Sequence, residues 1–106
     1  MKVIPVMDLL RGQVVHAVRG EREKYRPIQS KLCYTSDPLS MAVRFYQIGF
    51  TRAYLADLDA IQGGSPSLEL YRRITRHARL SLMVDAGVDS LEKARRIADC
   101  GVDHVI

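Results

Sequence analysis

The sequence predicts an α/β fold built on a parallel sheet, and two observations support this prediction. Apolar, strand-like runs recur at residues 3–9, 53–59, 80–87 and 102–106, and segments with helical apolar spacing separate them. Each of the first three runs also carries an aspartate near its end, Asp8, Asp57 and Asp85, so we expect three parallel neighbouring strands with these acids at the same edge. The chain has 106 residues, 47% hydrophobic and 26% charged, which is ordinary for one globular domain.

The first run, residues 3–9, is nearly continuous in apolar character, so we expect a strand buried on both faces. A second β-like run follows at 13–18, and Gly12 between them favours a tight turn and a small hairpin. Asp8 has two interpretations. It lies at the strand end where α/β proteins place their chemistry, or it caps the turn at residues 10–13.

Three helices are predicted between the later strands. The first begins at Asp37-Pro38, the second follows the glycines at 63–64, and the third begins at Ser90. Gly49 and Gly101 end the first and third helices. The inward-facing residues are expected to be Leu39, Ala42, Val43 and Tyr46 in the first helix, Leu68, Tyr71, Ile74 and Ala78 in the second, and Leu91, Ala94, Ile97 and Ala98 in the third.

Two architectures fit this repetition, an open doubly wound sheet and a parallel (β/α)8 barrel of the TIM type. No Gly-x-Gly-x-x-Gly turn follows the first strand, and acids end three successive strands, which favours the barrel. Such barrels typically need about 250 residues. We therefore expect residues 1–106 to be one incomplete domain, the N-terminal half-barrel with the first three and a half βα units. If the chain is complete as written, we expect it to form a homo-oligomer that buries its open edges.

Composition narrows the range of partners. The net charge of +4 favours anions, but the basic residues are spread along the chain without interleaved aromatic residues, so we expect no nucleic-acid partner. No apolar stretch is long enough for a membrane span and no signal-peptide layout is present, which predicts a cytoplasmic protein with no membrane partner. Cys33 and Cys100 are expected to be reduced thiols, with Cys100 in the core. Because no His, Cys or Asp spacing suggests a metal, we expect neither metal nor cofactor.

Several motifs along the chain resemble one family. They are Ile4-Pro5-x-x-Asp8-Leu9, Gly12-x-Val14-Val15, Asp37-Pro38, Leu55-x-Asp57-Leu58-Asp59 and Gly101-Val102. Together they resemble the histidine-biosynthesis barrels, a family that contains ProFAR isomerase and a cyclase. Leu9, Gly20 and the Asp57–Asp59 motif resemble the isomerase, and the cyclase has Lys where His16 stands.

The resemblance implies an Amadori rearrangement, aminoaldose to aminoketose, on a small sugar-like substrate with a phosphate at each end. It assigns Asp8 as a catalytic acid or base that works with a second aspartate from a fifth strand. This sequence contains no fifth strand, so whether the chain alone is an enzyme stays open. The residues expected to contact substrate are Asp57, His16, Arg19, Gly20 and Gly87. For Asp57 the alternative is the capping of a turn, and for His16 it is a hydrogen-bonded structural role.

One departure from the family opens alternatives. At the end of the third strand the isomerase has a glycine triplet that cradles phosphate, whereas this chain has Asp85-Ala86-Gly87. The charge of Asp85 would repel phosphate there. The chain is then an isomerase or a fragment of one, a paralogue of the same barrel with another phosphorylated substrate, or a non-catalytic half-barrel that only assembles or binds.

Overall fold

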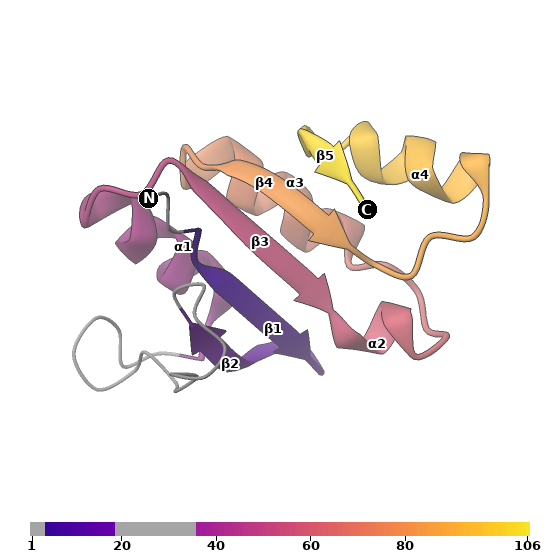
Figure 1. Ribbon diagram of the computed structural model, residues 1–106, viewed down its shortest axis with the longest axis horizontal. Coiled ribbons are helices and arrows are strands. Elements are labelled where there is room, and N and C mark those ends of the chain that lie inside the picture. Colours follow the sequence, from indigo (N-terminus) through magenta and orange to yellow (C-terminus); the bar gives the residue numbers. More distant parts are fainter. Residues whose placement is uncertain (1–3, 19–35) are drawn as a thin grey trace.

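A computed structural model describes residues 4–18 and 36–106 (Figure 1). In this part of the chain, strands and helices alternate after an initial hairpin. The elements are β1 Val6–Leu10, β2 Gln13–Val18, α1 Pro38–Gln47, β3 Arg52–Asp57, α2 Leu58–Ile61, α3 Leu68–His77, β4 Ser81–Asp85, α4 Leu91–Ala98 and β5 His104–Val105.

The strands form one sheet in the order β2-β1-β3-β4-β5. β1, β3, β4 and β5 pair in parallel, and β2 pairs antiparallel with β1 as the edge of a hairpin. Arg11 and Gly12 form the hairpin turn with positive φ angles of 53° and 76°. The predicted α/β class with a mainly parallel sheet and the predicted hairpin are therefore confirmed.

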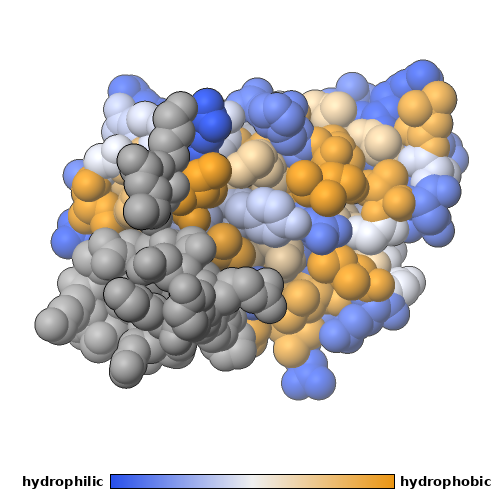
Figure 2. Space-filling view, in the orientation of Figure 1, coloured by the Kyte–Doolittle hydropathy of each residue, from blue (hydrophilic) through white to orange (hydrophobic). Residues whose placement is uncertain are grey.

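The two faces of the sheet differ in burial. Along β1, β3 and β4, fully buried residues alternate with partly exposed ones, so one face is packed and the other is not. α1 and α3 lie behind the sheet in Figure 1 and cover the packed face. Figure 2 shows apolar side chains gathered on the opposite face, over the middle of the sheet. In the described part of the chain the helices cover only one face of β1, so burial on both faces, as predicted for residues 3–9, is not found there.

The helices begin where the sequence predicts. The carboxylate of Asp37 caps α1 and the hydroxyl of Ser90 caps α4, each accepting a hydrogen bond from the backbone N–H three residues later. α3 turns Tyr71, Ile74 and Ala78 into the core as expected.

The predicted inward faces of α1 and α4 are partly wrong. Met41, Ala42 and Phe45 are the core residues of α1, whereas Tyr46 is 42% exposed. In α4 only Ile97 is fully buried, and Leu91 is 75% exposed. Ala98 is exposed as well. Apolar spacing alone did not fix the rotation of either helix about its axis.

The short helix α2 was not predicted, because residues 53–59 were expected to be one strand. β3 ends at Asp57, whose carboxylate accepts a hydrogen bond from the N–H of Ala60 and so caps α2.

Cys100 is a buried free thiol, as predicted, and Cys33 lies outside the described residues. In the described part of the chain, no helix is long and apolar enough to cross a membrane.

Candidate functional site

The candidate site lies at the edge of the sheet where β1, β3 and β4 end. Because these strands are parallel neighbours, their carboxyl ends meet at one edge of the sheet. Parallel α/β proteins place their functional sites at this edge. The prediction that Asp8, Asp57 and Asp85 reach the same edge is confirmed. The register adds that Asp8 and Asp85 both pair with Ala56. The two carboxylates therefore stand in one row on the same face, about 10 Å apart between Cα atoms.

Asp85 is held by two hydrogen bonds within this row. The hydroxyl of Tyr54 donates to its Oδ2 atom at 3.2 Å, and the N–H of Gly87 donates to its Oδ1 atom at 3.2 Å. Tyr54 stands two residues before Ala56 on β3, so its ring lies on the same face as the two acids. The carboxylate of Asp85 is consequently held by a residue of the central strand β3 and by the loop that follows β4.

The phenol of Tyr54 keeps its proton at neutral pH and acts as a hydrogen-bond donor. Partial burial raises its pKa above the usual value, and the negative charges of Asp85 and Asp8, together with the hydrogen bond to Asp85, raise the pKa further. The register places Asp8 on the face of the sheet that also carries Tyr54 and Asp85, so the three side chains belong to one surface at the strand ends.

A β-bulge adjoins Asp8. Asp8 pairs with His16 and Leu9 pairs with Val14, so Val15 is the extra residue of β2. Bulges bend and twist a strand locally and are frequent next to active sites. The register thus places His16, a predicted substrate contact, opposite Asp8. The side chain of His16 lies outside the described residues.

Asp57 has a structural role instead of the predicted contact with substrate. Its side chain is fully buried and faces the helix layer, the opposite side from Asp8. Its carboxylate accepts hydrogen bonds from the N–H of Ala60 at 3.3 Å, the N–H of Ser67 at 3.0 Å and the hydroxyl of Tyr71. Burial and these partners favour the capping role that the sequence also offered for Asp57, on the side of the sheet away from Asp8.

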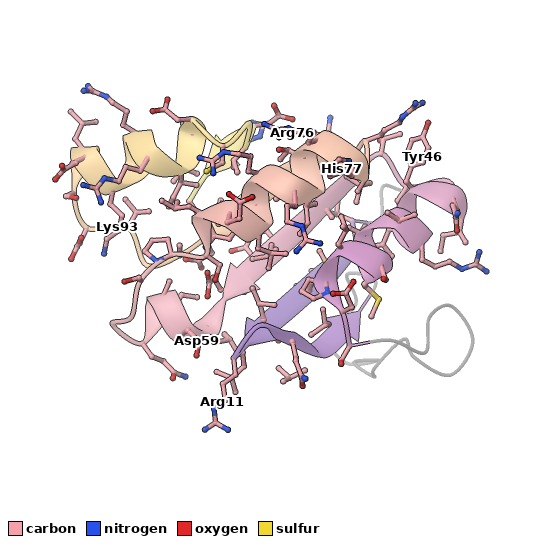
Figure 3. The ribbon with its side chains drawn as sticks, turned by 180° about the vertical axis from the view of Figure 1, so that it is seen from behind. Arg11, Tyr46, Asp59, Arg76, His77 and Lys93 are labelled. Atoms are coloured by element: carbon pink, nitrogen blue, oxygen red, sulfur yellow. The ribbon has the colours of Figure 1, made fainter. Side chains whose placement is uncertain are left out.

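Asp59 fastens the hairpin to the same edge. It belongs to α2, and its Oδ2 atom accepts a hydrogen bond from the N–H of Arg11 at 2.6 Å. Figure 3 shows Arg11 and Asp59 side by side at one end of the molecule, far from Tyr46 and His77 at the other. β3 ends at Asp57 and α2 begins at Leu58, so Asp57 and Asp59 do not lie on one strand.

The remaining predicted residues divide into two groups. Gly87 lies beside Asp85 at the end of β4, in the same part of the site. Arg19 and Gly20 lie outside the described residues. Within residues 4–18 and 36–106, no group of three or more His, Cys, Asp or Glu side chains is arranged to hold a metal ion.

Sequence reasoning missed Tyr54. The available signal was the period of two along a strand, which puts residues 54 and 56 on the face opposite 55 and 57. The arrangement that results offers carboxylates for proton transfer and for accepting hydrogen bonds, with a phenol between them.

These features define a class, an α/β protein with carboxylates gathered at the carboxyl ends of parallel strands. The family described as "Histidine biosynthesis protein" has a sequence model that matches residues 2–106. The chain belongs to this family.

Curated relatives support the same family membership. A protein of Prochlorococcus marinus (strain MIT 9211) is 32% identical over 107 residues, which cover 100% of this chain and 40% of the relative. One of Synechococcus sp. (strain JA-2-3B'a(2-13)) is 34% identical over 100% of this chain and 39% of its own length. Both are named 1-(5-phosphoribosyl)-5-((5-phosphoribosylamino)methylideneamino) imidazole-4-carboxamide isomerase, the activity called ProFAR isomerase above.

A third relative carries no assigned activity. It is a protein of Methanocaldococcus jannaschii described as uncharacterized, 34% identical over 92% of this chain and 42% of its own length. The chain therefore spans about 40% of the length of the curated relatives it matches.

Proposed function

We propose that the full-length protein carrying this chain is a ProFAR isomerase-like enzyme of histidine biosynthesis. It would convert an aminoaldose to an aminoketose on a phosphorylated ribosyl substrate. The observation that carries the proposal is the place of Asp8, on β1 at the carboxyl edge of the parallel strands and on the face opposite the helices. The names of the relatives from Prochlorococcus and Synechococcus support the same reaction.

Asp8 has the chemistry that this rearrangement needs. As a general acid it gives a proton to the ring oxygen while the C1–O bond breaks and the nitrogen lone pair forms a C1=N bond. A base then takes the proton from C2, and the resulting aminoenol tautomerises to the aminoketose. The family resemblance assigns that second group to the fifth parallel strand of the barrel, and the described parallel strands β1, β3, β4 and β5 would be the first four.

The same proposal makes the described sheet the N-terminal part of a (β/α)8 barrel. In such a barrel the helices surround one face of the sheet, and side chains from the other face fill the interior. The alternation of buried and partly exposed residues along β1, β3 and β4 supports this arrangement. An open doubly wound sheet would carry helices on both faces.

Replacing Asp8 tests the catalytic assignment. In the full-length protein, Asp8→Asn keeps the size of the side chain but cannot exchange the proton, so turnover of ProFAR is expected to fall at least about a hundredfold. Asp103→Asn is the matched control, because Asp103 precedes β5 at the opposite edge of the sheet and should leave turnover unchanged. Circular dichroism confirms that both variants fold. Turnover in Asp8→Asn close to that of the control would reject the assignment.

A second assay separates a catalytic chain from a fragment. The 106-residue chain and the full-length protein are compared on ProFAR at equal concentration. Turnover only in the longer protein assigns the missing base to residues outside this chain. Turnover in neither favours a paralogue with another phosphorylated substrate, or a non-catalytic half-barrel. Asp85 in place of a glycine supports the paralogue among these alternatives.

The proposal carries two further expectations. The partner is a small phosphorylated sugar-like molecule, as the phosphoribosyl groups in the relatives' name support. A cytoplasmic location is supported by the buried free thiol of Cys100, since free thiols persist in reducing compartments.

A further inference from the structure

The loop after β4 has a backbone that would suit an anion. Gly87 has a positive φ of 64°, and a Cβ atom built there would stand 3.0 Å from the Cα of Ile61 and 3.3 Å from the carbonyl oxygen of Ala60. Only glycine therefore lets the loop approach α2 this closely. A loop of this kind, between a strand end and a following helix, commonly turns N–H groups toward a bound phosphate.

In this chain the N–H of Gly87 is already occupied. It donates to Oδ1 of Asp85, so a carboxylate of the protein itself takes the place of an external anion. A phosphate entering the loop would compete for this N–H group and would meet the negative charge of Asp85 at close range.

Tyr54 keeps Asp85 in that position. Its hydroxyl holds Oδ2 while the loop holds Oδ1, which fixes the carboxylate in the row that also contains Asp8. Because burial and the two nearby negative charges raise the pKa of Tyr54, the phenol remains a donor throughout the neutral range. The remaining acceptor capacity of the carboxylate is available to a donor group of a ligand.

We propose that the carboxyl end of β4 excludes phosphate and instead receives a sugar hydroxyl of the substrate, which donates a hydrogen bond to Asp85. Asp85 is then a specificity-determining residue and Tyr54 its positioning residue. The inference rests on the proposed function, since it concerns the same strand-end site. It implies that any phosphate of the substrate is bound away from this loop.

Titration with inorganic phosphate tests whether the loop after β4 excludes phosphate, and it requires no measurement of turnover. The full-length protein is labelled with 15N-glycine and the amide signal of Gly87 is followed in the wild type and in Asp85→Gly. In the wild type the signal should not move saturably. In Asp85→Gly it should, with phosphate bound at least about tenfold more tightly, because one like charge is gone and the N–H is free.

Two further variants make the result decisive. Asp103→Asn removes the same charge at the opposite edge and should behave as the wild type, since Asp103 accepts a hydrogen bond from Ser81 far from this loop. Asp85→Asn keeps the shape of the side chain and replaces the glycine variant if that variant does not fold, with a smaller gain expected. Saturable binding at Gly87 in the wild type would overturn the proposal. So would no gain in either variant at Asp85, or an equal gain in Asp103→Asn.

A matched pair of ligands tests whether Asp85 receives a sugar hydroxyl. D-ribose 5-phosphate and D-ribose 1,5-bisphosphate differ only in having a hydroxyl or a phosphate on C1. The wild type should bind the monophosphate at least as tightly as the bisphosphate, and Asp85→Gly should reverse the preference. Tyr54→Phe, which frees Oδ2 while keeping the charge, should give an intermediate ratio. A wild-type preference for the bisphosphate that Asp85→Gly leaves unchanged would refute the hydroxyl assignment. If neither sugar binds, the hydroxyl assignment is rejected, the phosphate titration still decides the exclusion of phosphate, and the proposed function is judged separately by turnover of ProFAR.

Discussion

At the scale of single residues, Asp57 shows how a buried charge is accommodated. An unpaired carboxylate in a core is strongly unfavourable, yet this one is fully buried. It is stabilised because the backbone N–H groups of Ala60 and Ser67 and the hydroxyl of Tyr71 all donate to it. The same three bonds connect the end of β3 to α2 and to the first turns of α3. Asp57 therefore contributes to the site indirectly, by fixing the elements that surround it.

Tyr71→Phe removes one of these donors without changing the ring. We expect the free energy of unfolding at neutral pH to fall by about 1–3 kcal/mol, the cost of a buried group losing a partner. Urea denaturation measures it. The control is Tyr46→Phe, which removes the hydroxyl of an exposed tyrosine and should change the free energy of unfolding little.

The same variant should alter the response to alkali. Burial, followed by the hydrogen bond and the charge of Asp57, raises the pKa of Tyr71 far above its ordinary value of 10.0. The unfolded chain thus releases this proton at a lower pH than the folded chain does, so stability is lost as pH rises above about 10. Tyr71→Phe should lose less stability than the wild type between pH 9 and about 11. Equal alkaline losses would contradict this account.

The sequence predicted which acids lie at the strand ends, but it did not predict which face of the sheet each acid occupies. Asp8 and Asp85 could be placed at a strand end because an aspartate ends an apolar run. Which face each acid occupies depends on the register between strands, and no local signal in the sequence fixes that register. Asp57 was assigned to the substrate for this reason, although Leu55 and Asp57 share the buried face. Tyr54 was overlooked because an aromatic residue in a strand is ordinarily part of a core.

At the scale of elements, helix ends followed the sequence closely and helix rotations did not. Ser, Asp, Pro and Gly act locally, through capping bonds and allowed φ angles, so Asp37, Ser90 and Gly49 marked boundaries without knowledge of the fold. The face that a helix buries depends on its neighbours. α1 lies at the margin of the helix layer beside α3, and Phe45 fills the core where the apolar pattern had pointed to Tyr46.

The two caps offer a matched pair of substitutions. Oδ2 of Asp37 accepts from the N–H of Ser40 at 2.9 Å and from its hydroxyl at 2.7 Å, whereas Oγ of Ser90 accepts from the N–H of Lys93 at 3.1 Å. Asp37→Ala and Ser90→Ala should each cost about 1 kcal/mol at neutral pH. Only the first cost should depend on pH. The hydrogen bonds from Ser40 lower the pKa of Asp37 below its ordinary value of 3.8.

Because the folded-state pKa is the lower one, the contribution of Asp37 is present above about pH 4 and is lost as pH falls through it. The difference between wild type and Asp37→Ala should shrink on acidification, while the Ser90→Ala difference stays constant. Urea denaturation at several pH values measures both. A pH-independent cost for Asp37→Ala would show that its charge has no part in the cap.

At the scale of the whole molecule, one face of the sheet carries no helix within residues 4–18 and 36–106. Val6, Leu10 and Met83 are only partly buried there, and Ile106 beside β5 is 55% exposed. Apolar surface of this kind and strand edges favour association. We therefore expect the 106-residue chain, studied alone, to form a dimer or a larger assembly.

Sedimentation at micromolar concentration measures this. Met83→Glu places a charge on the face without helices and should shift the chain toward monomer, provided that circular dichroism shows it folded. Leu91→Glu is the control, since Leu91 is 75% exposed on α4 and its replacement should leave association unchanged. A dispersed wild-type monomer at every concentration would contradict the expectation.

The close approach at Gly87 has a consequence for sequence change over evolutionary time. A side chain at this exposed position would push against Ile61 of α2, and α2 carries Asp59, which holds the N–H of Arg11 next to β1. A substitution in the loop after β4 is thereby transmitted through α2 to the strand that bears Asp8. Loops are ordinarily free to drift one residue at a time. The loop after β4, the helix α2 and the hairpin turn are in contact, so we expect a substitution at Gly87 to be better tolerated when the residues of α2 that it meets change with it.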